Sequence, residues 1–178
     1  MTNNLTNFPT LNQPMTSGTV SWKFVLNSQF EESLVSNISI VPTVMDQYVM
    51  MKLSNGDWEL AGGTLEPDEA YLECLRREVM EELGAELIHY RIFGHFDCFN
   101  HAKEPYRPHL PFPHFVRVMG TGEVNIVTKP LNPEGGEEVV AVEVVDIEEA
   151  VKRFKEMGRS DLAELYWLAH QIRNSVEE

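Results

Sequence analysis

The sequence predicts an α/β (α+β) sandwich, in which helices flank the faces of a mixed β-sheet. The expected order is strands, one helix, more strands and two final helices, an order typical of sheets covered by helices. The chain has 178 residues, of which 43% are hydrophobic and 24% charged, so it holds enough apolar material for the core of one domain. We therefore expect a folded domain with modest extensions.

The first residues differ in composition from the rest of the chain. Residues 1–20 are rich in Asn, Thr and Pro and show little periodicity, so we expect a mobile arm. The alternative is an arm that packs on a second subunit of a homodimer. We place an N-terminal extension at residues 1–35 and the domain, including the C-terminal helices, at residues 36–178.

Short β-prone runs follow. β-Branched and aromatic residues at 38–44 and 47–53 predict two strands, separated by a turn near Asp46. Asn55-Gly56-Asp57 is a strong hairpin signal, after which residues 58–60 resume a short strand. We therefore expect a small antiparallel unit ahead of the first helix.

That helix is predicted over residues 67–83. Gly62-Gly63 interrupts the strand pattern, Pro67 favours the first turn of a helix, and Gly84 suits its end. Apolar residues recur at helical spacing along one side, namely Leu72, Leu75, Val79 and Leu83. The helix therefore has one core-facing stripe.

The second half continues with strands and ends in helices. Residues 87–99 resemble a strand, and four prolines within residues 100–113 predict a long loop. A hairpin is predicted around Gly120-Thr121-Gly122. The remaining predicted elements are strands at residues 114–119, 123–128 and 138–145, a helix at residues 147–157 and, after a Ser160 cap, a helix at residues 161–173.

Three glutamates lie on one flank of the first helix. Glu78, Glu81 and Glu82 have spacings that place their side chains on neighbouring positions of a helix. Carboxylates that are packed together repel one another, and a hard divalent cation relieves that repulsion. Their oxygens suit Mg²⁺, with Mn²⁺ as an alternative, and a carbonyl of the Gly62-Gly63 turn can complete the metal shell. The pattern therefore predicts a Mg²⁺ site at this helix.

The competing interpretation is a solvated helix face. Runs of glutamate on helices are usually stabilised by Lys or Arg four residues away. Here no matching set of lysines accompanies the three glutamates, and the helix is entered through two glycines. Arg77 lies one turn before Glu81, where it can orient a neighbouring carboxylate by a charge-assisted hydrogen bond. We therefore favour the metal site.

The segment from Gly62 to Ala85, GGTLEPDEAYLECLRREVMEELGA, resembles the Nudix box. That pattern is Gly, five residues, Glu, seven residues, Arg-Glu, a bulky apolar residue, any residue, Glu-Glu, any residue, Gly and an apolar residue. The matching residues are Gly63, Glu69, Arg77, Glu78, Val79, Glu81, Glu82, Gly84 and Ala85. Ala61, where the family often has Pro, and the small Ala85 are departures that concern packing and loop stiffness.

The resemblance implies a Nudix-like fold and a hydrolase that cleaves a phosphoanhydride bond by attack of water on phosphorus. The residues it assigns are, as metal ligands, Glu78, Glu81, Glu82 and the Gly63 carbonyl and, as orienting residues of the catalytic box, Glu69 and Arg77. Glu78 or a carboxylate from a later loop would activate the water. The later candidates are Glu137 and Glu138, for which a plain exposed turn is the alternative.

The long loop is the candidate for substrate recognition. Lys103, Tyr106 and Arg107 suit phosphate binding or stacking on a base, although an ordinary connection is equally consistent with the loop. The expected substrate is a nucleoside diphosphate linked to another moiety, or a nucleoside triphosphate. A weaker alternative is a zinc site formed by His95, His101, His109 and His114. Their spacing fits no standard zinc pattern.

Charge and cysteine content limit the partners. A net charge of −14 disfavours binding to duplex nucleic acid, but a bound cation can reverse the local field for a small anionic substrate. No secretory signal or membrane-spanning stretch is expected, and the two cysteines imply no disulfide framework, so the default location is the cytoplasm.

Two other functions compete with the hydrolase. A nucleotide-sensing regulator with the same fold would not need intact catalytic carboxylates, yet all of them are present. A Nudix-fold isomerase acting on a prenyl diphosphate would need a positioned Cys and Glu pair beyond the box, and nothing marks Cys98 for that role. We therefore expect a hydrolase.

Overall fold

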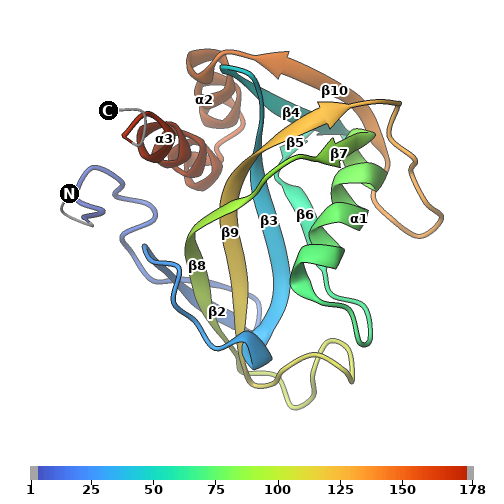
Figure 1. Ribbon diagram of the computed structural model, residues 1–178. Coiled ribbons are helices and arrows are strands. Elements are labelled where there is room, and N and C mark those ends of the chain that lie inside the picture. Colours follow the sequence, from blue (N-terminus) through green and yellow to red (C-terminus); the bar gives the residue numbers. More distant parts are fainter. Residues whose placement is uncertain (1–3, 176–178) are drawn as a thin grey trace.

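The computed structural model describes residues 4–175, which form one curved sheet and three α-helices (Figure 1). The strands are β1 (Met15–Ser17), β2 (Val20–Val25), β3 (Val35–Val44), β4 (Gln47–Leu53), β5 (Trp58–Glu59), β6 (Ala61–Thr64), β7 (Ala85–Leu87), β8 (Arg91–Asn100), β9 (His114–Ile126) and β10 (Val139–Val145). The helices are α1 (Tyr71–Leu83), α2 (Ile147–Glu156) and α3 (Ser160–Asn174), with a 3-10 turn at Glu32–Leu34. None of the helices in this part of the chain is both long and apolar enough to span a membrane.

The sheet is mixed, as predicted. Its main path runs β1-β2-β8-β9-β3-β4-β10. β3 and β9 are parallel, whereas the other neighbours along the path are antiparallel. The short strands attach at the side, because β5 pairs with β4, β6 with β3 and β7 with β9. β6 therefore brings the glycine pair that precedes α1 next to the central strand β3.

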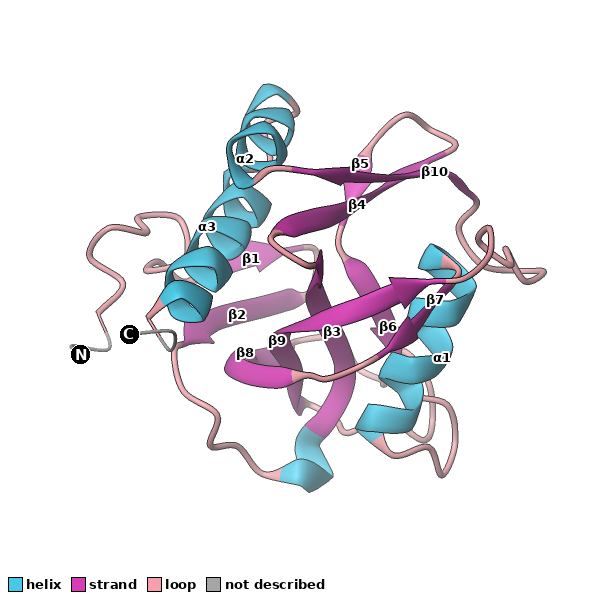
Figure 2. Ribbon diagram, turned by 45° about the horizontal axis from the view of Figure 1, so that its top comes forward, coloured by secondary structure: helices cyan, strands magenta, loops and turns pink. Residues whose placement is uncertain are grey.

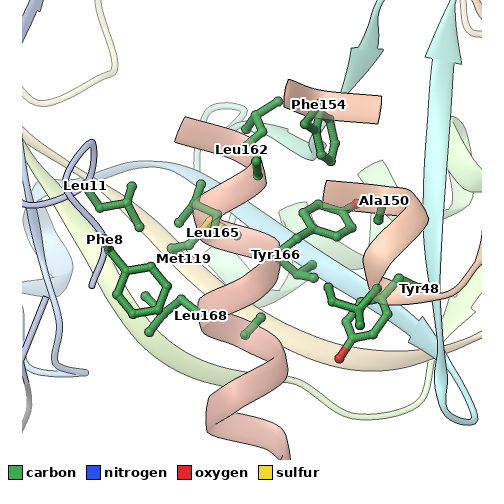
Figure 3. Packing of buried hydrophobic residues seen from close by; sticks show 14 of the residues in the cluster. Phe8, Leu11, Tyr48, Met119, Ala150, Phe154, Leu162, Leu165, Tyr166 and Leu168 are labelled. Atoms are coloured by element: carbon green, nitrogen blue, oxygen red, sulfur yellow. The ribbon is translucent and has the colours of Figure 1, made fainter. Parts of the chain in front are cut away.

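Helices cover both faces of this sheet, which confirms the predicted sandwich (Figure 2). α1 packs on one face through Leu75 and Val79, which are buried together with Ile38 of β3. α2 and α3 cover the opposite face, where Phe154 and Tyr166 are fully buried around α3 (Figure 3). The two cores lie on opposite sides of β3 and β9, so both cores are built on these two strands.

The N-terminal arm is built into the domain. Phe8 and Leu11 keep only 3% and 1% of their exposure, and both lie beside α3 (Figure 3). The Glu164 carboxylate on α3 accepts hydrogen bonds from the backbone N–H groups of Thr10 and Leu11, at 3.0 and 2.9 Å. The described part of the arm therefore differs from the expected mobile segment, because two apolar side chains anchor an otherwise polar stretch. Residues 1–3 of the expected arm lie outside the described residues.

The predicted hairpin at residues 120–122 is wrong. β9 runs unbroken through Gly120 and Gly122 and pairs with both β3 and β8. A Cβ on Gly120 would lie 2.5 Å from the Arg91 carbonyl oxygen, and one on Gly122 would lie 2.1 Å from the His89 carbonyl oxygen. These glycines therefore allow close approach of the backbone inside a strand.

Two predicted helix starts and one strand also need correction. α1 begins at Tyr71 rather than at Pro67, because Asp68 has a φ of +61°, which a right-handed helix does not allow. Ser160, the predicted cap, is instead the first helical residue of α3. The strand predicted at residues 87–99 is divided into β7 and β8.

Candidate active site

The candidate site lies where α1 meets the glycine pair of β6. The Glu82 carboxylate accepts a hydrogen bond from the backbone N–H of Gly62, at 2.9 Å. Gly62 has a φ of +141°, which side chains rarely adopt, and a Cβ on Gly63 would lie 2.0 Å from a carboxylate oxygen of Glu78. The two glycines therefore allow the backbone of β6 to press directly against two of the three glutamates.

Arg77 joins the other carboxylates of the box. Its guanidinium donates two hydrogen bonds to Glu69, at 2.8 and 3.0 Å. It also donates to Glu78 at 2.8 Å and to Glu81 at 3.3 Å. A further hydrogen bond, at 3.3 Å, reaches the backbone carbonyl of Thr64 on β6. Glu69, Arg77, Glu78 and Glu81 thus form one network that is tied to both α1 and β6.

The carboxylates of this cluster have different surroundings. Burial raises the pKa of Glu82 to about 8, and the negative charges of Glu78 and Glu137 add to that rise. Burial also raises the pKa of Glu78, in spite of its hydrogen bond from Arg77. By contrast, the hydrogen bonds from Arg77 lower the pKa of Glu69. A negative charge on Glu82 is therefore strongly disfavoured while no cation is bound.

The chemistry of this donor set suits a hard divalent cation. Glu69, Glu78 and Glu81 share the single positive charge of Arg77, and carboxylate oxygens are ligands that Mg²⁺ favours. Within residues 4–175, no three His, Cys, Asp or Glu side chains converge on one ion position. The reason is that Arg77 holds Glu78 and Glu81 while Gly62 holds Glu82. In each of these contacts only one oxygen of the carboxylate accepts the hydrogen bond.

A cleft leads from the glycine pair across the sheet face opposite α1. One cavity, of about 380 Å³, begins at Gly62 and Gly63 and is lined further by the charged residues Glu59, Arg117, Arg159 and Asp161. A second cavity, of about 490 Å³, continues to the loop at residues 101–113. Three residues line both cavities, namely Trp22, Asn37 and Arg117. The sequence analysis missed them, because the only signal is the alternation of side chains along β2, β3 and β9.

The residues predicted to bind substrate are only partly at this cleft. Tyr106 lines the larger cavity, whereas Lys103 and Arg107 are exposed and do not line it. The Arg107 guanidinium lies over the Tyr106 ring, 5.4 Å from its centroid. The loop is nonetheless attached to the site, because the His109 imidazole is hydrogen-bonded to the Leu65 carbonyl at 2.8 Å.

The histidines of the zinc alternative are not brought together. Each has a separate partner: the Asn27 carbonyl for His95, the Ser21 hydroxyl for His101, the Leu65 carbonyl for His109 and the Asp97 carboxylate for His114. No metal-binding group of three such side chains is found in the part of the chain that the structure covers. The zinc alternative is therefore without support there.

The two late carboxylates lie in the exposed segment before β10. Glu137 has an electrostatic link to the cluster, because its charge raises the pKa of Glu82. The segment is held at the end of α1 by a hydrogen bond of 2.8 Å from the Leu131 N–H to the Glu81 carbonyl. Glu138 is exposed as well and follows directly in the chain. The segment thus lies beside the site without an ordered contact between either side chain and the glutamates.

Comparison with known proteins identifies the family. The family model described as "NUDIX domain" matches residues 35–166, which is most of the chain. The chain therefore belongs to the Nudix family, which confirms the resemblance of its Gly62–Ala85 segment to the Nudix box. The predicted fold class is confirmed too, because solved Nudix structures superpose on this one.

The relatives are similar over limited stretches. Nucleoside triphosphatase NudI of Salmonella schwarzengrund is 47% identical over 47 residues, and that of Salmonella arizonae is 45% identical over 47 residues. Each match covers 23% of this chain and 33% of the relative, so the chain spans about a third of the length of these relatives.

Two solved structures share the fold. A NUDIX hydrolase from Nitrosomonas europaea superposes with a TM-score of 0.56 at 17% identity, over 78% of this chain and 89% of that chain. The pyrophosphohydrolase BsRppH of Bacillus subtilis gives a TM-score of 0.54 at 15% identity, over 70% of this chain and 71% of that chain. At these identities the likeness establishes the architecture alone.

Proposed function

We propose that this Nudix protein is a Mg²⁺-dependent hydrolase that cleaves a phosphoanhydride bond. The substrate is a nucleoside diphosphate linked to another moiety, or a nucleoside triphosphate, and Mn²⁺ is the alternative cation. The observation that carries the proposal is the glutamate cluster of α1 at the head of an open cleft. The relatives named as nucleoside triphosphatase NudI support the same chemistry.

In the proposed reaction, water attacks one phosphorus atom, a P–O bond forms and the bridging P–O bond breaks. Glu78, Glu81, Glu82 and the Gly63 carbonyl would hold the cation, which supplies positive charge for the phosphate oxygens. Arg77 and Glu69 keep Glu78 and Glu81 in place from one side, and Gly62 keeps Glu82 in place from the other.

A carboxylate takes the proton of the attacking water. We assign this role to Glu78 or to Glu137, the late carboxylate that influences the cluster electrostatically. Glu78 is a candidate because it belongs to the cluster itself, where burial raises its pKa in the metal-free protein. The loop at residues 101–113 remains a proposed recognition element, since Tyr106 lines the cleft.

The competing functions predict different behaviour. A nucleotide-sensing regulator would bind nucleotides without turnover. The isomerase alternative needs a reactive cysteine near a glutamate, but Cys98 keeps 1% exposure and its thiol contacts the Phe96 carbonyl at 3.5 Å. Burial raises the pKa of Cys98 to about 12, so this thiol stays protonated at neutral pH. We therefore retain the hydrolase.

The test is a substrate panel of nucleotide sugars, dinucleotides and free nucleoside triphosphates. Orthophosphate and pyrophosphate release are scored separately, with Mg²⁺ and with a chelator. We expect at least one class of substrate to be hydrolysed in the presence of Mg²⁺ and not in the presence of chelator. We expect Glu78→Gln to lose that activity. Binding of nucleotides without turnover in every class would overturn the hydrolase in favour of a sensor.

A further inference from the structure

The sheet face opposite α1 carries a row of side chains from four neighbouring strands. Phe24 of β2 is paired with Phe96 of β8, Phe96 with Arg117 of β9, and Arg117 with Asn37 of β3. Side chains that are paired in this way lie on the same face of a sheet. Trp22 is two residues before Phe24 in β2 and therefore shares that face as well.

Only part of this face is covered. Phe24 keeps 2% exposure because it lies in the core under α3. Trp22 and Asn37 remain partly exposed, Arg117 is exposed, and all three line the two cavities of the cleft. The face is therefore packed at Phe24 and open at Trp22 and Arg117, where an indole ring and a guanidinium are available to a ligand.

Arg117 has no anionic partner in the described part of the chain. Its guanidinium lies over the Phe96 ring, 5.8 Å from the centroid, and no ion pair or side-chain hydrogen bond of Arg117 is found among residues 4–175. Arg159 on the other wall differs, because it donates to Glu59 and to Asp161, in each case at 3.0 Å. In a protein of net charge −14, an arginine without a partner inside a cleft is suited to an anionic ligand.

The position of this row relative to the glutamates indicates which part of a bound ligand would lie near each residue. Asn37 pairs with Arg117 on one side and with Thr64 on the other, next to Gly63. β9 is two strands from β6 and β2 is four, so Arg117 lies roughly 10 Å and Trp22 roughly 19 Å from β6 at the usual strand spacing. Side chains at both ends shorten these spans. A phosphate next to the scissile bond would therefore meet Arg117, and the part beyond it would meet Trp22.

We propose that Trp22 and Arg117 form the subsite for the nucleoside end of the substrate, with the base stacked on Trp22 and the neighbouring phosphate bound by Arg117. The inference rests on the proposed function, since it places the reacting phosphates at the α1 glutamates. An indole stacks on any base, and a guanidinium binds phosphate through paired hydrogen bonds. Trp22 lies before residue 35, outside the region that matches the family, so the extension supplies a determinant of specificity.

The test measures binding and kinetics of Trp22→Ala, Trp22→Phe and Arg117→Ala. Calorimetric titration with ADP and with tripolyphosphate, in the presence of a chelator, reports binding without turnover. Stacking contributions of the usual size correspond to roughly 5- to 150-fold in affinity. We expect Trp22→Ala to weaken ADP binding by about that factor and leave tripolyphosphate unchanged, while Trp22→Phe retains most of the affinity. Arg117→Ala should weaken both ligands.

Kinetics on the best panel substrate separate this subsite from the catalytic cluster. We expect Trp22→Ala to raise KM with little change in kcat, and Trp167→Ala, a matched control at an exposed tryptophan of α3, to change neither. Melting curves show whether each variant is folded, and Trp22→Phe keeps the test decisive if Trp22→Ala is not.

The outcomes are distinguishable. Trp22-dependent ADP binding in a protein that hydrolyses nothing on the panel would remove the proposed function and leave the subsite. If hydrolysis is lost in Glu78→Gln while ADP affinity and KM are unchanged in Trp22→Ala and Trp22→Phe, the subsite is wrong and the hydrolase stands. Failure of the wild-type protein to bind ADP would also overturn the subsite.

Discussion

Glu82 is held by the backbone N–H of Gly62, 20 residues earlier in the chain, through a hydrogen bond of 2.9 Å. This bond joins α1 to β6 at the point where the cleft begins. It is also the only one of the described contacts of Glu82 that favours its ionised form, against burial and the charges of neighbouring carboxylates. The metal-free protein therefore holds Glu82 in place at an electrostatic cost that depends on pH.

The first prediction concerns this pH dependence. Burial raises the folded-state pKa of Glu82 to about 8 from an ordinary 4.5, so folding favours the protonated form. Its contribution to stability is fully present below about pH 4.5 and is lost as the pH rises through about 8. At 1.36 kcal/mol per pKa unit, the loss is at most about 5 kcal/mol. Glu82→Gln should not show this loss of stability.

The measurement is the free energy of unfolding of both proteins in chelator between pH 5 and pH 9. We expect the advantage of Glu82→Gln over the wild type to grow from pH 5 to about pH 8 and to level off above it. Parallel stability curves for the two proteins would contradict the raised pKa.

The second prediction links Mg²⁺ to stability and turnover. A ligand that binds only the folded state stabilises it by mass action, so millimolar Mg²⁺ should raise the melting temperature of the wild type. Glu82→Gln should lose most of that gain and about 10² to 10³ in turnover, the usual effect of removing one electrostatic contribution at a reacting centre. Glu86→Gln, at an exposed position of β7, is the matched control and should keep both. A Mg²⁺ response in Glu82→Gln equal to that of the wild type would exclude Glu82 as a ligand.

The third prediction compares two adjacent arginines. Arg77→Ala removes the guanidinium that Glu69, Glu78 and Glu81 share. Because the Arg77 side chain is 24% exposed, we expect a loss of about 1–3 kcal/mol, less than for a fully buried ion pair. Arg76→Ala, at an exposed position of the same helix, should stay within about 0.5 kcal/mol of the wild type. Denaturant titration checks both, and equal stabilities of the two variants would show that the network contributes nothing.

The fourth prediction tests the close approach at Gly63. In Gly63→Ala the new Cβ would lie 2.0 Å from a carboxylate oxygen of Glu78, so that side chain must move. A displacement of about 1 Å at a catalytic group can lower turnover by about 10²-fold. Gly136→Ala is the control, because its Cβ would meet nothing closer than the Pro133 carbonyl oxygen at 3.4 Å. Steady-state kinetics should show a loss in Gly63→Ala alone, and wild-type turnover there would argue against a fixed position for Glu78.

The network around Arg77 is predictable from sequence because its geometry is local. Arg77 and Glu78 lie on α1, and Glu69 lies two residues before it, so the network that joins them is confined to one short stretch of chain. The helix begins at Tyr71, four residues after the predicted start at Pro67. The sequence does not indicate this, because the positive φ of Asp68 leaves no local sequence signal.

The features that the sequence analysis missed depend on contacts between distant segments. Trp22 and Arg117 come to one face only through the pairing of β2, β8 and β9, and neither residue belongs to a motif. The N-terminal arm was expected to be mobile because its composition is polar. Its anchor is Glu164, more than 150 residues away, whose carboxylate accepts from the Thr10 and Leu11 N–H groups. Composition describes the tendency of a segment in isolation, and these contacts exist only once α3 has packed.

The place of β2 in the sheet has a practical consequence for preparing this protein. β2 lies between β1 and β8, and it forms backbone pairs along β8 from His95 to Asn100. A version without residues 1–34, which precede the region matched by the family, would leave β8 as an open edge with unpaired N–H and carbonyl groups. Such an edge is a template for addition of strands from other molecules. Aggregation of the trimmed protein would then report the loss of an edge cover, and would be no evidence about its active site.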